Sequence, residues 1–217
     1  MSPQCIIFDC DGVLVDSEAL SNRVLIDMAQ EQGVTISEDY ADAHFQGQFL
    51  HHIFDWIAKQ SGRPLPKDFE QDYRARTFGL FRTDLQPVDG IREVLEHINL
   101  PKCVASSGPL NKIKLNLTVT GLIDYFDGHL FSCYDIGKWK PDPAIFLYAA
   151  EKMGFAPSDC LVVEDSLPGV RAARAGGFRV LGYANTRNRK AFEAEGAQVI
   201  GDVREVLKIF SLKNATS

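Results

Sequence analysis

Two aspartates lie near the start of the chain, directly after a short apolar run. The run at residues 5–8 is rich in β-branched and aromatic residues, which is typical of a buried strand, and Asp9 and Asp11 follow it. Carboxylates at the end of a buried strand lose hydration, which is costly unless a cation or a set of donors compensates them. Taken alone, the two aspartates also fit a capping Asp followed by an Asp-Gly turn.

Three further segments carry hydroxyl, ammonium or carboxylate groups beside strand-like or helix-like runs. Taken singly, Ser106 could cap the following helix and Lys140 could be a solvated surface residue. The groups are Ser106 and Ser107 after residues 102–105, Lys140 before a proline-initiated helix, and Glu164 and Asp165 after residues 160–163.

These groups are expected to converge, because ligands of open α/β sheets bind beyond the carboxyl ends of the strands. Four carboxylates facing one another in a partly dry cleft repel strongly. A hard divalent cation held by oxygen ligands relieves that repulsion, and Mg²⁺ suits one or two carboxylates together with waters and a phosphate. The hydroxyl and ammonium groups are then suited to donate to a phosphoryl group.

The elements that must position these residues alternate between strands and helices. This alternation implies parallel pairing with right-handed crossovers, and hence a doubly wound α/β sheet. The apolar runs predict strands at 5–8, 102–106, 130–133, 160–163, 178–181 and 198–200, and helices at 91–98, 110–119, 143–153 and 170–175.

A helical stretch interrupts this alternation after the first strand. Residues 18–32 and 49–59 carry apolar positions at helical spacing, and a third helix is expected to begin at Pro66. The simplest organisation is an α/β core made of residues 1–16 and 86–217, with residues 17–85 inserted as a helical domain.

The composition limits the classes of function. The chain has 217 residues, a net charge of −6 and 45% hydrophobic residues, which disfavours nucleic-acid binding through phosphate neutralisation. No apolar stretch approaches the roughly 20 residues that span a bilayer, and Asp9 and Asp11 interrupt any signal-like start.

Five widely spaced cysteines fit reduced thiols in a cytoplasmic protein, and a monomer is the default. Cys10 lies between the two aspartates, but no neighbouring histidine could activate it as a nucleophile.

The order of these motifs resembles the haloacid dehalogenase superfamily of hydrolases over essentially the full length of the chain. The superfamily consists of phosphotransferases with an aspartate nucleophile, and its members carry a helical cap after the first strand of a Rossmann-like core. The resemblance identifies residues 17–85 as the cap. The motifs are Asp9-Cys10-Asp11-Gly12, Ser106, Lys140-Pro141 and Glu164-Asp165.

The resemblance implies a role for each site residue. Asp9 attacks phosphorus to form an aspartyl-phosphate, and Asp11 acts first as general acid and then as general base. Ser106, Ser107 and Lys140 hold the phosphoryl oxygens. The implied Mg²⁺ ligands are the Asp9 carboxylate, the Asp11 backbone carbonyl and Asp165, with Glu164 as a ligand or as a neighbour of the ligands. In the cap, the loop at Gly47 is expected to reach over the substrate, which makes Gln48 a candidate for substrate specificity.

The resemblance implies that an aspartate at the position of Asp11 serves an alkoxide leaving group, because the dehalogenases of the superfamily lack it, and the expected substrate is therefore a phosphate ester. We expect a Mg²⁺-dependent phosphatase that acts on a small phosphorylated metabolite, such as a sugar phosphate or a sugar-acid phosphate. The chain is also similar to β-phosphoglucomutases, but Ser21 and Leu50 replace their cap histidine and phosphate-binding arginine. A phosphosugar mutase and an inactive relative that binds a cation or phosphate stay open as alternatives.

Overall fold

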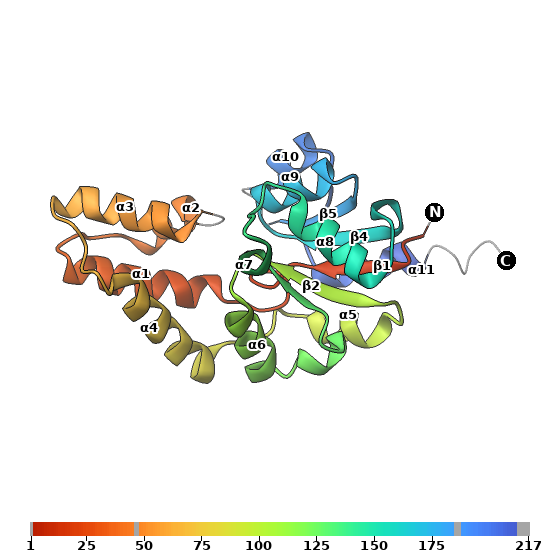
Figure 1. The fold of residues 1–217 in the computed structure, drawn as a ribbon, viewed down its shortest axis with the longest axis horizontal. Coiled ribbons are helices and arrows are strands. Elements are labelled where there is room, and N and C mark those ends of the chain that lie inside the picture. The colour runs from red at the N-terminus through yellow and green to blue at the C-terminus, as the bar shows by residue number, and fades with distance from the viewer. Residues whose placement is uncertain (1, 46–47, 185–187, 212–217) are drawn as a thin grey trace. The chain divides into compact units, whose positions relative to one another are not determined.

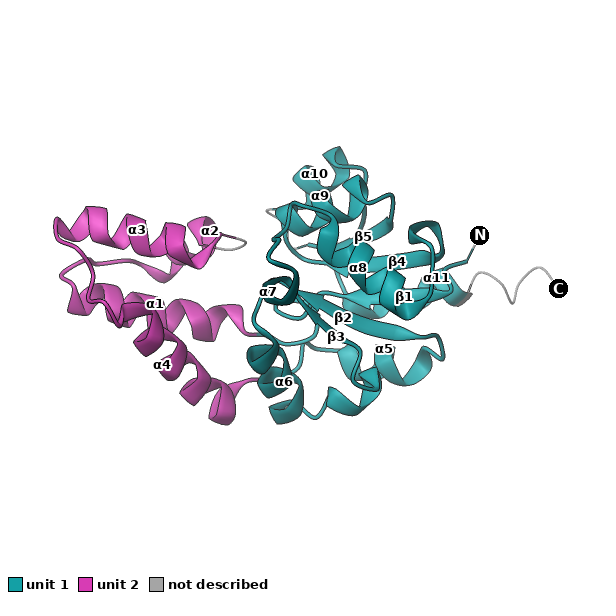
Figure 2. Ribbon diagram, in the orientation of Figure 1, with its two compact units in different colours: residues 1–16, 86–217 teal, residues 17–85 magenta. Residues whose placement is uncertain are grey.

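The computed structural model describes residues 2–45, 48–184 and 188–211. The chain forms two compact units: residues 1–16 together with 86–217, and residues 17–85 (Figure 2). The first unit contains the sheet and the second is helical (Figure 1).

The sheet has six strands in the order β3-β2-β1-β4-β5-β6, and every neighbouring pair is parallel. This arrangement confirms the predicted doubly wound α/β fold, and its strand order is that of a Rossmann-like core. Figure 1 shows β1 between β2 and β4. The strands are β1 (Cys5–Phe8), β2 (Lys102–Ser106), β3 (Leu130–Ser132), β4 (Cys160–Glu164), β5 (Arg179–Tyr183) and β6 (Gln198–Ile200).

Both faces of the sheet are covered, so its central strands are buried throughout. On one face, Cys5 and Ile7 belong to a cluster that includes side chains of α8 and α9. On the other, Phe8 meets Phe126 edge to face, with ring centroids 6.2 Å apart.

The α-helices of this unit are α5 (Ile91–His97), α6 (Leu110–Val119), α7 (Cys133–Ile136), α8 (Ala144–Met153), α9 (Leu167–Ala175), α10 (Arg189–Ala194) and α11 (Lys208–Ser211). Its 3₁₀ helices are η1 (Ile123–Phe126), η2 (Pro157–Asp159) and η3 (Val203–Leu207).

The third strand ends one residue earlier than the sequence predicts. Ser132 is its last residue, and its hydroxyl accepts a hydrogen bond from the Tyr134 backbone N–H at 3.1 Å. This bond caps α7, so Cys133 is helical although the predicted strand included it.

The helical unit contains α1 (Glu18–Glu31), α2 (Glu38–His44), α3 (Leu50–Ser61) and α4 (Phe69–Asp84) around its own apolar core. The third predicted helix begins at Phe69 rather than at Pro66. The short helix α2 was not predicted, although Ser37 caps it by accepting from the Tyr40 N–H at 3.2 Å.

The two connections to the helical unit are paired within the sheet unit. Asp16 N–H donates to the Gln86 carbonyl at 2.9 Å, and Val88 N–H donates to the Leu14 carbonyl at 3.0 Å. The chain therefore leaves the sheet unit and re-enters it at neighbouring points.

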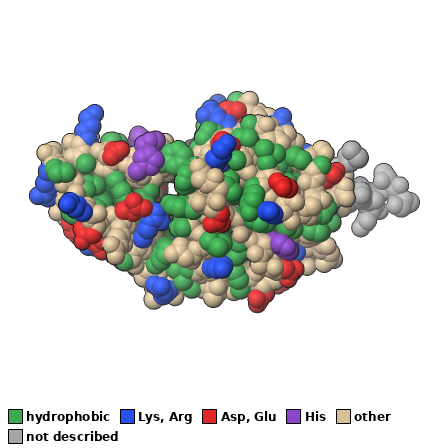
Figure 3. All heavy atoms as spheres, in the orientation of Figure 1, with side chains coloured by type: hydrophobic (Ala, Val, Ile, Leu, Met, Phe, Trp, Pro, Cys, Tyr) green, Lys and Arg blue, Asp and Glu red, His purple; other side chains and the backbone are tan. Residues whose placement is uncertain are grey.

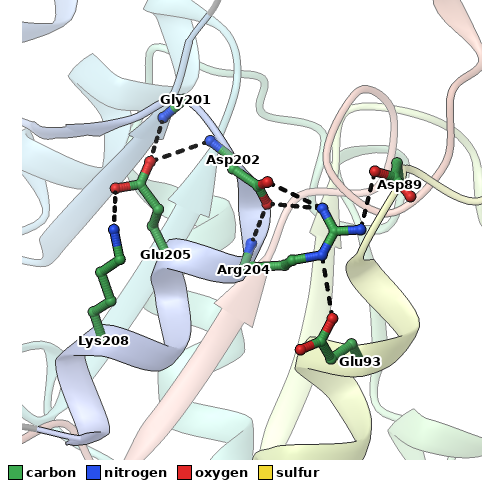
Figure 4. A network of polar contacts seen from close by, with 7 residues as sticks. All are labelled: Asp89, Glu93, Gly201, Asp202, Arg204, Glu205 and Lys208. Atoms are coloured by element: carbon green, nitrogen blue, oxygen red, sulfur yellow. Dashed lines mark hydrogen bonds and ion pairs between the residues drawn. The ribbon is translucent and has the colours of Figure 1, made fainter.

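A polar network fixes the segment that follows the second connection (Figure 4). Arg204 donates to Asp89 at 3.0 Å, to Glu93 at 3.2 Å and to Asp202 at 3.0 Å. Gly90 has a φ of +81°, and its missing side chain leaves space for Arg204. The network thereby ties η3 to the start of α5.

On the face drawn in Figure 3, Lys and Arg side chains are interspersed with Asp and Glu. Along α4, Arg74 pairs with Glu70 and Arg76 pairs with Asp72. Within the described ranges, no helix combines the length and the apolar character that crossing a membrane requires.

Candidate active site

The carboxyl ends of β2, β1 and β4 lie side by side, because β1 pairs with both of the other strands. The residues that follow these strands meet there, as the sequence predicts. The convergence brings Asp9, Asp11, Ser106, Lys140, Glu164 and Asp165 to one edge of the sheet.

Asp9 extends the ladder one residue beyond β1, since its N–H donates to the Val163 carbonyl at 2.9 Å. Its side chain is buried. Burial raises the pKa of the Asp9 carboxyl to about 7 against the opposing charge of Lys140, and Glu164 and Asp11 add to the rise. A further positive charge beside Asp9 would favour the ionised form of its carboxyl group.

Lys140 is buried, so the alternative of a solvated surface lysine is wrong. Its Nζ donates to Asp9 Oδ1 at 2.5 Å, to Glu164 Oε2 at 2.7 Å and to the Ala105 carbonyl at 3.1 Å. Burial lowers the pKa of the ammonium group, but the two carboxylates raise it above its ordinary value. Lys140 therefore stays charged. Its two acidic neighbours supply the negative partners that a buried cation needs.

Asp9, Glu164 and Asp165 each offer a carboxylate oxygen, and these oxygens lie within 4.8 Å of one another. Both carboxylate oxygens of Glu164 already accept hydrogen bonds. Oε2 accepts from Lys140, and Oε1 accepts from the Ser166 N–H at 3.0 Å and from the Ser166 hydroxyl at 2.7 Å. A side chain at Gly12, whose φ is +79°, would overlap Asp165. Only glycine lets the loop after β1 pass this close to Asp165.

The two serines after β2 have different surroundings. Ser106 is buried, and its Oγ accepts from the Gly108 N–H at 3.0 Å. It does not cap α6, whose capping position is Pro109, so that alternative is wrong. Ser107 is exposed and lies beside the Cys133 thiol, whose pKa burial raises and Lys140 and Ser107 lower.

Two residues that sequence reasoning missed contact Asp11. Lys112 Nζ lies 2.8 Å from Asp11 Oδ2, and Asn116 Nδ2 donates to Asp11 Oδ1 at 3.2 Å. Lys112 and Asn116 could have been found from their spacing of four residues, which puts them on one face of the helix that directly follows the serines. Cys10 is fully buried, and burial raises the pKa of its thiol well above the ordinary value, so it is not an available nucleophile.

Gln48 belongs to the helical unit rather than to the sheet edge. It is exposed, and its N–H donates to the Phe45 carbonyl at 3.0 Å. Gly47, which the sequence analysis placed in the substrate-covering loop, lies outside the described residues.

Comparison with known proteins identifies the family of the chain. The family model for haloacid dehalogenase-like hydrolases matches residues 3–177. The chain is 36% identical over 188 residues to the 6-phosphogluconate phosphatase of Escherichia coli K12, covering 86% of this chain and 85% of that protein. It is 32% identical over 178 residues to hexitol phosphatase B of the same organism, covering 80% of each. A crystal structure of a candidate β-phosphoglucomutase from Thermotoga maritima matches with a TM-score of 0.80 at 26% identity, covering 96% of this chain and 98% of that chain.

The chain therefore belongs to the haloacid dehalogenase-like hydrolases. It is a phosphoric monoester hydrolase.

Proposed function

We propose that this protein is a Mg²⁺-dependent phosphatase that hydrolyses a sugar phosphate or a sugar-acid phosphate through an aspartyl-phosphate on Asp9. The observation that carries the proposal is the buried carboxylate Asp9, which lies 2.5 Å from Lys140 and among the oxygens of Glu164 and Asp165.

The carboxylates fit a hard cation. Asp9 and Asp165 would hold Mg²⁺ together with the Asp11 backbone carbonyl, and a bound cation would oppose the rise that burial causes in the pKa of Asp9. Glu164 is better suited to hold Lys140, because Lys140 and Ser166 already occupy its two oxygens. When bound, the ion supplies positive charge that screens Asp9 from the incoming phosphate.

The chain's own residues would carry out two displacements. Asp9 attacks phosphorus, the bond from phosphorus to the ester oxygen breaks, and Asp11 gives its proton to the leaving alkoxide. Asp11 then takes a proton from water, whose oxygen attacks the same phosphorus and releases inorganic phosphate and free Asp9. Ser106 and Ser107 would donate to the phosphoryl oxygens throughout. Lys140 would donate to them by turning one of its three N–H groups away from its present acceptors, Asp9, Glu164 and the Ala105 carbonyl.

We assign the choice of substrate to the helical unit 17–85, acting as a cap, with Gln48 as a specificity residue. This assignment rests on the family resemblance. A cap that opens and closes would exclude bulk water from the cleft. Among substrates, 6-phosphogluconate and hexitol phosphates come first, because the relatives named above are phosphatases of those compounds.

The test is release of inorganic phosphate from a panel that contains 6-phosphogluconate, hexitol phosphates, glucose 6-phosphate and p-nitrophenyl phosphate, with Mg²⁺ or with EDTA. We expect Mg²⁺-dependent turnover of at least one phosphosugar. Asp9→Asn, which keeps the shape but removes the nucleophile, should abolish it. Absence of turnover throughout the panel would contradict the proposal and favour an inactive relative that binds only the cation or phosphate.

A phosphosugar mutase is the second candidate, favoured by the match to the candidate β-phosphoglucomutase. Ser21 and Leu50 argue against it, since a second phosphate would lack a cationic partner at the position of Leu50. Incubation with β-glucose 1-phosphate separates the two: a mutase yields glucose 6-phosphate, whereas a phosphatase yields free phosphate.

A further inference from the structure

Each carboxyl oxygen of Asp11 faces a donor from helix α6. Lys112 Nζ lies 2.8 Å from Asp11 Oδ2, and Asn116 Nδ2 lies 3.2 Å from Asp11 Oδ1. Residues four apart in a helix lie on one face, one turn above the other. One face of α6 therefore supplies a separate donor to each oxygen of a single carboxyl group.

Stability alone is a poor explanation for these contacts. The side chains of Lys112 and Asp11 are 19% and 26% exposed, and partly solvated ion pairs of this kind contribute little to folding. Asn116 is fully buried, and within the described parts of the chain its Oδ1 has no hydrogen-bond partner. An unsatisfied buried amide oxygen destabilises a fold, so an apolar residue would pack at position 116 at lower cost.

The position of Lys112 also relates it to the other site residues. A Cβ built on Gly108 would lie 3.4 Å from Lys112 Cδ, 3.4 Å from Ser106 Oγ and 3.7 Å from Asp11 Oδ2. The stem of Lys112, the serine hydroxyl and the Asp11 carboxyl therefore surround one small volume next to the loop after β2. The absence of a side chain at Gly108 leaves that volume open.

We propose that Lys112 and Asn116 are positioning residues that fix the Asp11 carboxyl in the orientation from which it protonates the leaving group. The proposal rests on the phosphatase function proposed above. A carboxyl group that is free to rotate loses most of its value as an acid, because proton transfer requires an oriented donor within hydrogen-bond reach. Two donors on two different oxygens prevent that rotation.

Leaving-group dependence separates this role from a structural one. A sugar alkoxide needs a proton in order to leave, whereas p-nitrophenolate leaves readily without one. A variant that misplaces the Asp11 carboxyl should therefore slow the hydrolysis of alkyl phosphates selectively. Damage to the fold, the nucleophile or phosphate binding should affect both kinds of substrate.

The experiment measures kcat/KM for the best phosphosugar of the panel and for p-nitrophenyl phosphate, because kcat/KM reports the steps up to departure of the leaving group. In Lys112→Met and in Asn116→Leu, we expect the ratio of sugar to aryl kcat/KM to fall about 10-fold or more. Lys114→Met is the matched control, since Lys114 is an exposed lysine of the same helix. Its ratio should stay within about 2-fold of wild type.

A double-mutant cycle tests whether Lys112 acts through Asp11. In an Asp11→Asn background, Lys112→Met should produce no further fall in the ratio. A further fall would mean that Lys112 acts on the substrate directly, and would overturn the proposal. An unchanged ratio in both single variants of the wild-type protein would overturn it as well. A wild-type protein that hydrolyses neither substrate would instead refute the proposed function, so the two failures are distinguishable.

Discussion

Replacing Gly169 with alanine tests whether Glu164 must stay in place to hold Lys140. Gly169 lies in the first turn of α9, and an added Cβ would overlap the carboxyl group of Glu164, well inside the 3.0 Å that real Cβ contacts respect. Glu164 is buried, with one oxygen on Lys140 and the other on Ser166. The carboxylate must therefore move, and its ion pair with Lys140 breaks or stretches.

The size of the effect follows from opposing contributions. Breaking a buried ion pair costs about 3–5 kcal/mol, and the lower value applies because Lys140 keeps Asp9 as a partner. Alanine is the better helix former by at most about 1 kcal/mol. The net loss is about 2 kcal/mol in the free energy of unfolding, or about 4–8 °C in Tm for a chain of this length.

Differential scanning calorimetry measures this loss, with Gly79→Ala as the matched control. Gly79 is an exposed residue within α4, and no heavy atom lies within 4 Å of its added Cβ. It should gain about 1 kcal/mol from helix propensity alone. If Gly169→Ala were as stable as wild type while Gly79→Ala behaved as expected, the claim that Glu164 is locked in place would be refuted.

Three further outcomes are expected. The five cysteines are all buried, and burial raises the pKa of thiols such as Cys10, so the reactive thiolate forms only above the ordinary pH range. Native protein should therefore resist a disulfide reagent at pH 8 and react fully only in denaturant; rapid labelling of the native state would contradict this. Mg²⁺ should raise the Tm of the wild type, because a ligand of the native state stabilises it, and Asp165→Asn should lose that shift. An equal shift in the variant, measured by calorimetry, would remove Asp165 from the ligand set. Arg204→Ala should lower the free energy of unfolding only slightly, since its three partners are exposed to solvent, and high salt should shrink the difference. Urea unfolding at two salt concentrations measures this, and a salt-independent loss would indicate packing rather than charge.

The strands were predictable because each central strand is buried on both faces and so carries an unbroken apolar run. Residues 5–8 and 160–163 show this most clearly. The prediction was wrong where a local bond decides the structure, as at Cys133, which follows the capping hydroxyl of Ser132. The helix α2 was missed because seven residues are too few to show a helical period.

The sequence by itself determined which chemical groups stand at the carboxyl edge of the sheet, because Asp9, Ser106 and Glu164 each end or directly follow a strand. Parallel strands bring their carboxyl ends to one side, so order along the chain suffices for that inference. Only the tertiary structure decided which groups pair. Lys140 reaches Asp9 across 131 residues of sequence, and Lys112 lies against Asp11, because such contacts depend on the direction of side chains from different elements.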